Sequence, residues 1–261
     1  MVGRVGIIGA GHLAGYLLEG FHRAAPGLRI LVSDCDLPRA EAQARRWGAV
    51  AVADNQELAD GSDLVILAVR PQDALQALGG VRFTRKQTLA SAAAGVTLGQ
   101  LAPAVDPARA VRVMPISSAA LNRSPTLLCP GHPAAAEVFA LLGQVHVVAD
   151  EEAFRAASVI AAFYGWVYAL ADETVAWTQL HGVPPEVARP LVLETIRSTA
   201  DVALARPGDS LQLLLDQLAT PGGITRHGLA VLRRERGLEA WNQALDAVLE
   251  RLQGAPDVKP A

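Results

Sequence analysis

Lysine is almost absent from this chain, which has only Lys86 and Lys259 beside twenty-one arginines. Cysteine is equally scarce, and Cys35 and Cys129 are too few for a disulfide framework or a cysteine-built metal site. The formal net charge of -3 gives no electrostatic reason to bind nucleic acid or an anionic membrane. These absences predict a small-molecule partner, with no nucleic acid, no membrane and no metal.

Targeting and membrane-spanning segments are also missing from the pattern. No signal peptide precedes the first apolar strand, so we expect a reducing cytoplasm. The one stretch that could be mistaken for a membrane span, residues 156–171, has no charged residue but is shorter than the roughly 20 apolar residues that a span needs. We therefore expect this stretch to be the central helix of a second domain, buried on nearly all sides and belonging to a subunit interface.

The composition that remains is that of a well-buried globular protein. Hydrophobic residues make up 51% of the 261 residues and charged residues 19%, which is enough apolar material for one large or two modest domains.

The first part of the chain alternates short apolar runs with helical patterns. After the first strand, the predicted strands are 29–34, 49–52, 63–69, 88–91, 110–114 and 145–148. This βαβ rhythm predicts an α/β domain over residues 1–150, a Rossmann-type doubly wound sheet that is mainly parallel. In such a sheet the cofactor binds at the carboxyl ends of the strands.

The second part of the chain carries no strand signal. It predicts an all-helical domain over residues 151–253, with helices at 151–180, 185–205, 209–218, 225–235 and 238–252. Glycine and proline break the pattern between these helices. Residues 254–261 are predicted to be a disordered tail.

A glycine turn of the form G-x-G-x-x-A follows the first apolar strand. Gly9 permits the tight turn, Gly11 lets the backbone approach a pyrophosphate, and Ala14 lets the helix pack closely on the strand. The helix that follows starts with free N–H groups facing the phosphates, so His12 and Leu13 join the predicted dinucleotide site.

The end of the second strand gives a mixed signal about the adenosine ribose. Asp34 would accept hydrogen bonds from a free 2′-hydroxyl and favour NAD, whereas Ser33 and Arg39 would hold a 2′-phosphate and favour NADP. Arg39 is equally well explained as a solvated surface residue of the next helix.

Further motifs follow in order along the chain. They are Ala68-Val69-Arg70-Pro71-Gln72, Ala93-Ala94-Gly95, Arg112-Val113-Met114-Pro115 and Thr220-Pro221-Gly222-Gly223. Together with the glycine turn they resemble the Δ1-pyrroline-5-carboxylate reductase family over nearly the whole chain. The resemblance implies an NAD(P)H-dependent reductase of a cyclic imine carboxylate, with a Rossmann domain and an interlocked helical domain that forms a homodimer. It favours NADPH, with NADH as the alternative, and it adds to the cofactor site Ala68, Val69, Arg70, Pro71, Ala94, Gly95, Met114 and Pro115.

The departures from the family pattern lie near the expected substrate pocket. Ile116 stands where the family has asparagine, and Ile224 where it has threonine. The family's small Ser-Gly-Ser-Gly-Pro-Ala-Tyr segment is replaced by residues 161–168, which carry Phe163, Tyr164 and Trp166. These changes predict a reshaped pocket and an altered substrate, while proline synthesis itself remains open.

Candidate substrate residues lie in the helical half. The turn Thr220-Pro221-Gly222-Gly223 leads into a helix at Thr225, and its free N–H groups predict a seat for a substrate carboxylate. Tyr164 and Tyr168 lie four residues apart on one helix face, so one of them is a candidate proton donor, although tyrosines at this spacing are more often core residues. The catalytic candidates are therefore Thr225, Tyr164 and Tyr168.

Two other readings remain open from the residues. A cofactor-binding regulator without catalysis is favoured by Ile116 and the lost serines, and disfavoured by the retained turn at Gly222-Gly223. A β-hydroxyacid-type dehydrogenase uses lysine-assisted chemistry, and no lysine lies between Lys86 and Lys259.

Overall fold

The computed structural model describes residues 2–254, which divide into two compact units. Residues 2–158 together with 252–254 form the first unit, and residues 159–251 form the second. Apart from Gly254, the predicted disordered tail at 254–261 lies outside the described residues. The helix α7 (Glu151–Ser158) belongs to the first unit.

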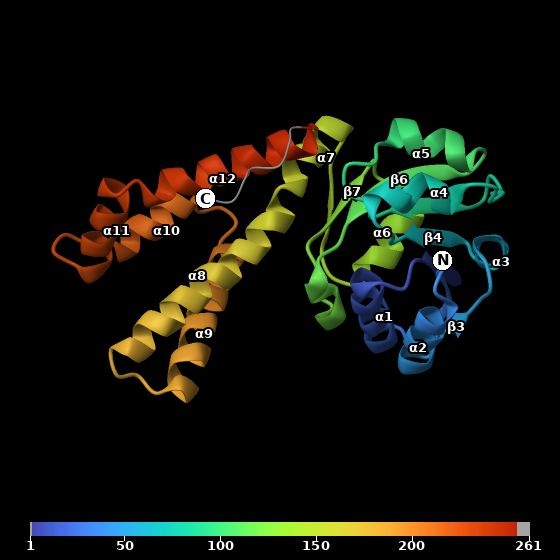
Figure 1. Cartoon of the computed structure of the whole chain (residues 1–261). Helices are drawn as coiled ribbons and strands as arrows, with labels where there is room; N and C mark the ends of the chain where they lie inside the picture. The colour runs from blue at the N-terminus through green and yellow to red at the C-terminus, as the bar shows by residue number, and fades with distance from the viewer. Residues whose placement is uncertain (1, 255–261) are drawn as a thin grey trace. The chain divides into compact units, whose positions relative to one another are not determined.

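An eight-stranded sheet with the order β3-β2-β1-β4-β5-β6-β7-β8 forms the centre of the first unit (Figure 1). All neighbouring strands are parallel except β6 and β7. The predicted α/β class with a mainly parallel, doubly wound sheet is thus confirmed. The strands are β1 (Arg4–Ile8), β2 (Arg29–Ser33), β3 (Val50–Ala51), β4 (Leu64–Leu67), β5 (Thr88–Ser91), β6 (Arg109–Met114), β7 (Thr126–Cys129) and β8 (Val145–Val147).

Helices cover both faces of this sheet, because alternate residues of its buried strands point to opposite sides. In β4, Leu64 and Ile66 join the core under one layer of helices, while Val65 and Leu67 join the core under the other. The first layer is α1 (His12–Ala24), α2 (Leu37–Trp47) and α6 (Pro133–Ala140); the second is α3 (Asn55–Asp60), α4 (Ala74–Leu78) and α5 (Leu98–Val105).

The strand β7 was not predicted from the sequence. It pairs with β6 in the antiparallel direction. Only the short 3-10 helix η2 (Ser117–Leu121) and a few loop residues separate β6 from β7. A parallel pair is usually joined by a crossover that contains an α-helix, and this link contains none, so the chain returns antiparallel. Another 3-10 helix, η1 (Pro71–Asp73), follows β4.

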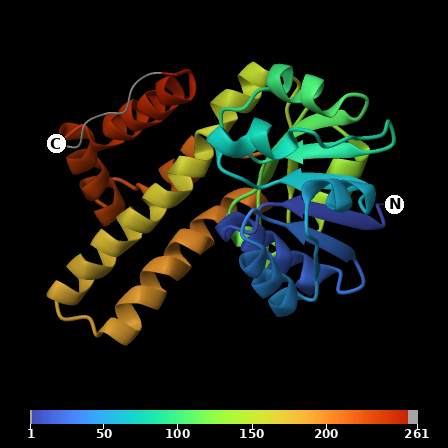
Figure 2. The same ribbon diagram turned by 45° about the vertical axis from the view of Figure 1, so that its right-hand side comes forward.

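The second unit is entirely helical within residues 159–251, as predicted. The expected helix over 151–180 is divided at Val159 into α7 and α8 (Ile160–Leu180). The helices α8 and α9 (Pro185–Ala205) lie side by side and antiparallel in both views (Figures 1 and 2). The remaining helices are α10 (Leu211–Leu218), α11 (Ile224–Arg234) and α12 (Gly237–Leu252).

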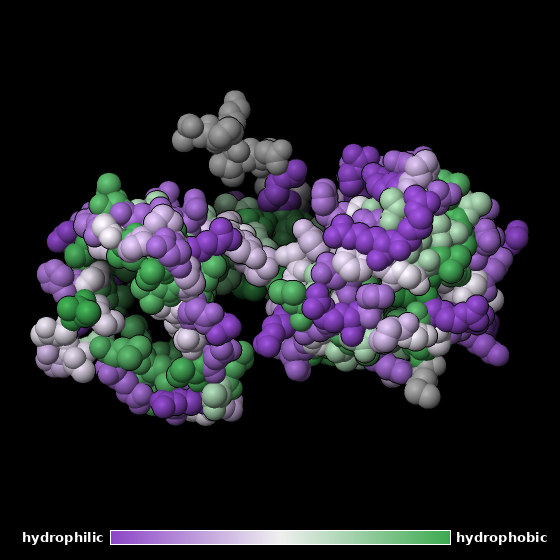
Figure 3. All heavy atoms as spheres, turned by 90° about the horizontal axis from the view of Figure 1, so that it is seen from below, coloured by the Kyte–Doolittle hydropathy of each residue, from purple (hydrophilic) through white to green (hydrophobic). Residues whose placement is uncertain are grey.

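The expectation that residues 156–171 are buried on nearly all sides is wrong for the single chain. Of the residues of α8 only Ala171 is buried, while Tyr168 is 59% exposed and Leu170 50% exposed. Apolar surface is visible over the helical unit in Figure 3. The reason is that one copy of this unit provides no second layer over this face of α8. By length and composition alone, the stretch Glu151–Leu180 could cross a membrane. A single helix of this kind is weak evidence for a membrane protein.

Candidate active site

The glycine turn joins β1 to α1 at the carboxyl edge of the sheet, next to the point where the strand order reverses between β1 and β4. Gly9 has a φ of 103°, and a Cβ atom there would lie 2.7 Å from the carbonyl oxygen of Ala68. The backbone N–H of Gly9 donates to the carbonyl of Ser33 at 2.8 Å. The turn is therefore clamped between β2 and β4, which only glycine permits at this position.

Gly11 behaves differently, because a Cβ atom there would meet no atom within 4 Å. It is the N-cap of α1, and it provides no side chain to accept the first N–H groups of the helix. An open space in front of unpaired helix amides, which include those of His12 and Leu13, is the geometry that a pyrophosphate requires. The residues at this turn therefore fit a dinucleotide.

Asp34, directly after β2, stabilises the glycine turn through hydrogen bonds. Its Oδ2 accepts the N–H of Ala10 at 2.6 Å, and its Oδ1 accepts Nη2 of Arg39 at 2.5 Å. The hydroxyl of Ser33 is buried and donates to Oδ1 of Asn55 at 2.6 Å. Of the three predicted ribose residues, Arg39 thus offers an exposed cation, Asp34 has both oxygens engaged, and Ser33 faces the interior.

The electrostatics of Asp34 follow from these contacts. Burial raises the pKa of this carboxyl group, but the hydrogen bonds from Arg39 and from the N–H groups of Asp36 and Ala10 outweigh it. The net pKa therefore lies below its ordinary value of 3.8. Asp34 is ionised at neutral pH and stabilises the turn in that form.

We expect Asp34→Asn to lower the free energy of unfolding by about 1.5 kcal/mol at pH 7, because one partner of this charged hydrogen bond is half exposed. A carboxyl with a depressed folded pKa contributes stability above its unfolded pKa and loses it as the pH falls through the folded value. The difference between the two proteins should then stay constant from pH 7 to about 5 and shrink below about pH 4. Urea unfolding across this range measures it, and a difference that vanishes already at pH 6 contradicts the assignment.

The other predicted cofactor residues follow the neighbouring strands. Ala68 donates its N–H to the carbonyl of Ile8 at 2.8 Å, which places the end of β4 beside the turn. Arg70 is exposed and pairs with Asp73, and Pro71 opens η1. The remaining members of the set lie at or just past the ends of β4, β5 and β6, at the same edge of the sheet: Val69, Ala94, Gly95, Met114 and Pro115.

A cavity of about 260 Å³ lies in the first unit beyond β5 and β6. It contains two predicted residues, Gly95 and Met114. Its other lining residues were not among the predicted site residues, although Arg112 opens one of the family motifs: Thr97, Arg112, Arg155, Ser158, Leu252 and Gln253. The available signal was Arg112, a charge inside an otherwise apolar strand, because such a residue is rarely buried without a partner. Its partner is Glu151, at 3.1 Å.

Tyr164 and Tyr168 lie together on α8 in the helical unit. Their hydroxyl oxygens are 3.0 Å apart and share a hydrogen bond, and their rings meet edge to face. Tyr168 is exposed and Tyr164 half-buried. This pair is therefore accessible from the surface of the single chain, as a proton donor must be.

The turn predicted to hold a carboxylate also belongs to the helical unit. The N–H of Gly223 donates to the carbonyl of Thr220 at 3.0 Å, and Gly223 is the N-cap of α11. Gly222 has a φ of 77° and an open space where a Cβ atom would lie. Thr225 stands in the first turn of α11, exposed like Thr220 and Pro221, so the turn is open to a ligand.

The aromatic residues that replace the family's small segment pack within the helical unit. Phe163 and Trp166 meet Trp241 of α12 edge to face, with ring centroids 5.6 and 6.1 Å apart. Such contacts contribute beyond their buried area. The aromatic residues Phe163 and Trp166 thus pack against a third aromatic side chain, Trp241, which lies far along the sequence.

The described residues contain no group of three or more histidine, cysteine or acidic side chains able to hold a metal ion. With the open glycine turn and the strand-end residues, the fold and site define a dinucleotide-dependent oxidoreductase.

Comparison with known proteins identifies the family. Residues 151–255 match the model for pyrroline-5-carboxylate reductase dimerisation, and residues 4–95 match the model for NADP oxidoreductase, coenzyme F420-dependent. Pyrroline-5-carboxylate reductase 3 of Danio rerio is 30% identical over 95% of this chain and 90% of its own. The chain therefore belongs to the pyrroline-5-carboxylate reductase family, whose members are NAD(P)H-dependent oxidoreductases acting on a C=N bond.

Solved structures share the fold across both units. The 1-pyrroline-5-carboxylate reductase of Streptococcus pyogenes has a TM-score of 0.85 and 24% identity, covering 97% of this chain and 98% of that one. A Plasmodium falciparum pyrroline carboxylate reductase, solved with NADP bound, has a TM-score of 0.84 and 21% identity, covering 95% and 96%.

Proposed function

We propose that this protein is an NADPH-dependent reductase of a cyclic imine that carries a carboxylate, and that it works as a homodimer joined through its helical unit. The observation that carries the proposal is the glycine turn, where Gly11 opens onto free space in front of the amides of α1 in a chain of this family. A cytoplasmic location remains a prediction from the sequence.

The contacts of Asp34 and Arg39, the residues expected to meet the adenosine ribose, favour NADPH over NADH. Both oxygens of Asp34 already accept protein donors, so they are poorly available to a free 2′-hydroxyl. Arg39 instead presents a guanidinium at the rim, with 49% of its side chain exposed. A 2′-phosphate is the natural partner of that charge. The NADP bound to the Plasmodium falciparum relative agrees with this choice.

When bound, the nicotinamide supplies the hydride for the C=N carbon. The protein has little acid–base work to do, because a C=N nitrogen is basic enough to be protonated near neutral pH; it must position the carbon and exclude water. We assign the carboxylate to the N–H of Gly222 in the turn Thr220-Pro221-Gly222-Gly223, to the first N–H groups of α11 and to Thr225. The paired hydroxyls of Tyr164 and Tyr168 are the candidate proton donor.

The test of this function is the oxidation of NADPH or NADH, followed by absorbance, with a panel of five- and six-membered cyclic imino acids. We expect turnover with at least one imine and a lower KM for NADPH than for NADH. Tight binding of NADPH with no turnover of any imine would instead favour the non-catalytic regulator.

We expect pyrroline-5-carboxylate itself to be a poor substrate. The expectation comes from the sequence: Phe163, Tyr164 and Trp166 stand where the family has small residues, and Ile116 stands where it has a polar side chain, changes that favour a reshaped and more apolar pocket. Imines without a carboxylate should bind more weakly still, by about 1.5 to 3 kcal/mol, the range of a lost charge-assisted hydrogen bond. Steady-state kcat/KM across the panel measures both effects. Turnover of pyrroline-5-carboxylate at a housekeeping rate would make the altered-substrate prediction wrong and leave the plain family activity.

A further inference from the structure

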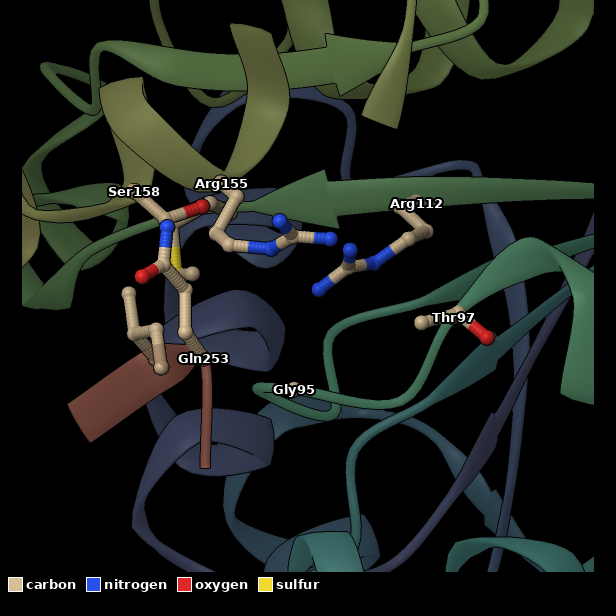
Figure 4. Close-up of a pocket in the computed structure, with 8 residues that line it drawn as sticks. Gly95, Thr97, Arg112, Arg155, Ser158 and Gln253 are labelled. Atoms are coloured by element: carbon tan, nitrogen blue, oxygen red, sulfur yellow. The ribbon is translucent and has the colours of Figure 1, made fainter. Parts of the chain in front are cut away.

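Two arginine side chains face each other across the cavity of the first unit. Arg112 reaches into it from β6 and Arg155 from α7, and Figure 4 shows their guanidinium groups pointing toward one another. Like charges that face each other repel. Such an arrangement is stable only if other groups compensate the charge.

Arg112 is fixed by its neighbours, but not all of its N–H groups have hydrogen-bond partners in the described part of the chain. Its side chain is 5% exposed, its Nη1 donates to Oε2 of Glu151 at 3.1 Å, and its guanidinium lies 4.4 Å from the ring centre of Phe154. Its Nε is buried with no hydrogen-bond partner among the described residues. Burial lowers the pKa of this guanidinium despite Glu151, and the charge of Arg155 lowers it further. A buried donor without a partner is costly and requires an explanation.

Arg155 is half-buried and makes no ion pair within residues 2–254. Glu151, one turn earlier on α7, directs one oxygen to Arg112 and the other to the N–H of Leu98, at 3.0 Å. Two cations and one carboxylate thus leave the cavity with a net charge of about +1.

We propose that this cavity binds the carboxylate group of a small organic anion between Arg112 and Arg155. A monoanion matches the net charge, and the planar guanidinium fork matches the geometry of a carboxylate. The side chain of Met114 offers apolar surface for the carbon part of the ligand. The site is separate in the chain from the turn at 220–223. It shares Gly95 and Met114 with the predicted cofactor set, so its test is made without cofactor.

The test is an NMR titration of the full-length protein, without cofactor, using pyrrole-2-carboxylate as the probe and pyrrole-2-carboxamide as its uncharged counterpart. We expect the carboxylate to bind at least about tenfold more tightly than the amide. Arg155→Gln should abolish this preference. Arg85→Gln, which removes an exposed arginine outside the cavity, should leave it unchanged.

A second variant should change the affinity for the carboxylate in the opposite direction. Glu151→Gln keeps an oxygen for the N–H of Leu98 but removes the negative charge, so the carboxylate should bind more tightly, by severalfold. A purely structural role of the cluster would not strengthen binding. The melting temperature of each ligand-free variant shows that it is folded.

Three outcomes would overturn the proposal: equal affinity for carboxylate and amide, unchanged affinity in Arg155→Gln, or inorganic phosphate binding more tightly than the carboxylate. The NADPH oxidation assay is independent of this titration. A protein that reduces no imine but binds the carboxylate through Arg155 would refute the reductase and support the site. A protein that reduces an imine but does not bind the carboxylate through Arg155 would support the reductase and refute the site.

Discussion

Gly11→Val should abolish binding of NADPH while leaving the fold intact. The backbone of Gly11, with φ of −75° and ψ of −168°, is one that any residue adopts, and its Cβ direction points into empty space. The valine side chain would then occupy the volume that a pyrophosphate needs in front of α1. Losing two charge-assisted hydrogen bonds weakens binding by at least roughly a hundredfold.

Calorimetric titration with NADPH measures the affinity, and the melting temperature measures the fold. Gly9→Ala is the matched control, because its φ of 103° and the 2.7 Å approach of its Cβ to the Ala68 oxygen should cost about 1–3 kcal/mol of stability. The two glycines of one motif are thus expected to fail in different ways. A folded Gly11→Val protein that binds NADPH as well as the wild type would refute the site.

The double variant Leu211→Asp, Leu218→Asp should convert a dimer into a monomer. The helical unit buries few large side chains by itself, and Leu211 and Leu218 on α10 are 73% and 68% exposed. Covering such a leucine contributes about 1.5–3 kcal/mol, whereas burying an unpaired carboxylate is unfavourable. The dimer dissociation constant should therefore rise by at least roughly a hundredfold.

Light scattering at micromolar concentration measures the mass of each protein. Leu75→Asp, an exposed leucine on α4 of the first unit, is the matched control and should leave the dimer intact. A wild-type chain that is monomeric at this concentration would make the predicted homodimer wrong.

Local patterns carried most of the correct sequence predictions. The glycine turn was recognisable because Gly9, Gly11 and Ala14 act within one strand–helix junction. Apart from the division between α7 and α8, the helices of the second half were predicted to within a few residues, because glycine and proline end them through their own backbone preferences.

Most of the succession of elements, the glycine turn after β1 and the family resemblance could therefore be predicted from the sequence, since each depends on residues close together in the chain or on ordered motifs. Three features depend on contacts between distant segments and could not be predicted: β7 runs antiparallel to β6, Arg112 pairs with Glu151 thirty-nine residues away, and Trp241 packs against Phe163. The tertiary structure also decided that α8 is exposed in the single chain. Periodicity reports that a face is apolar, but which surface covers that face depends on contacts between distant segments or separate chains.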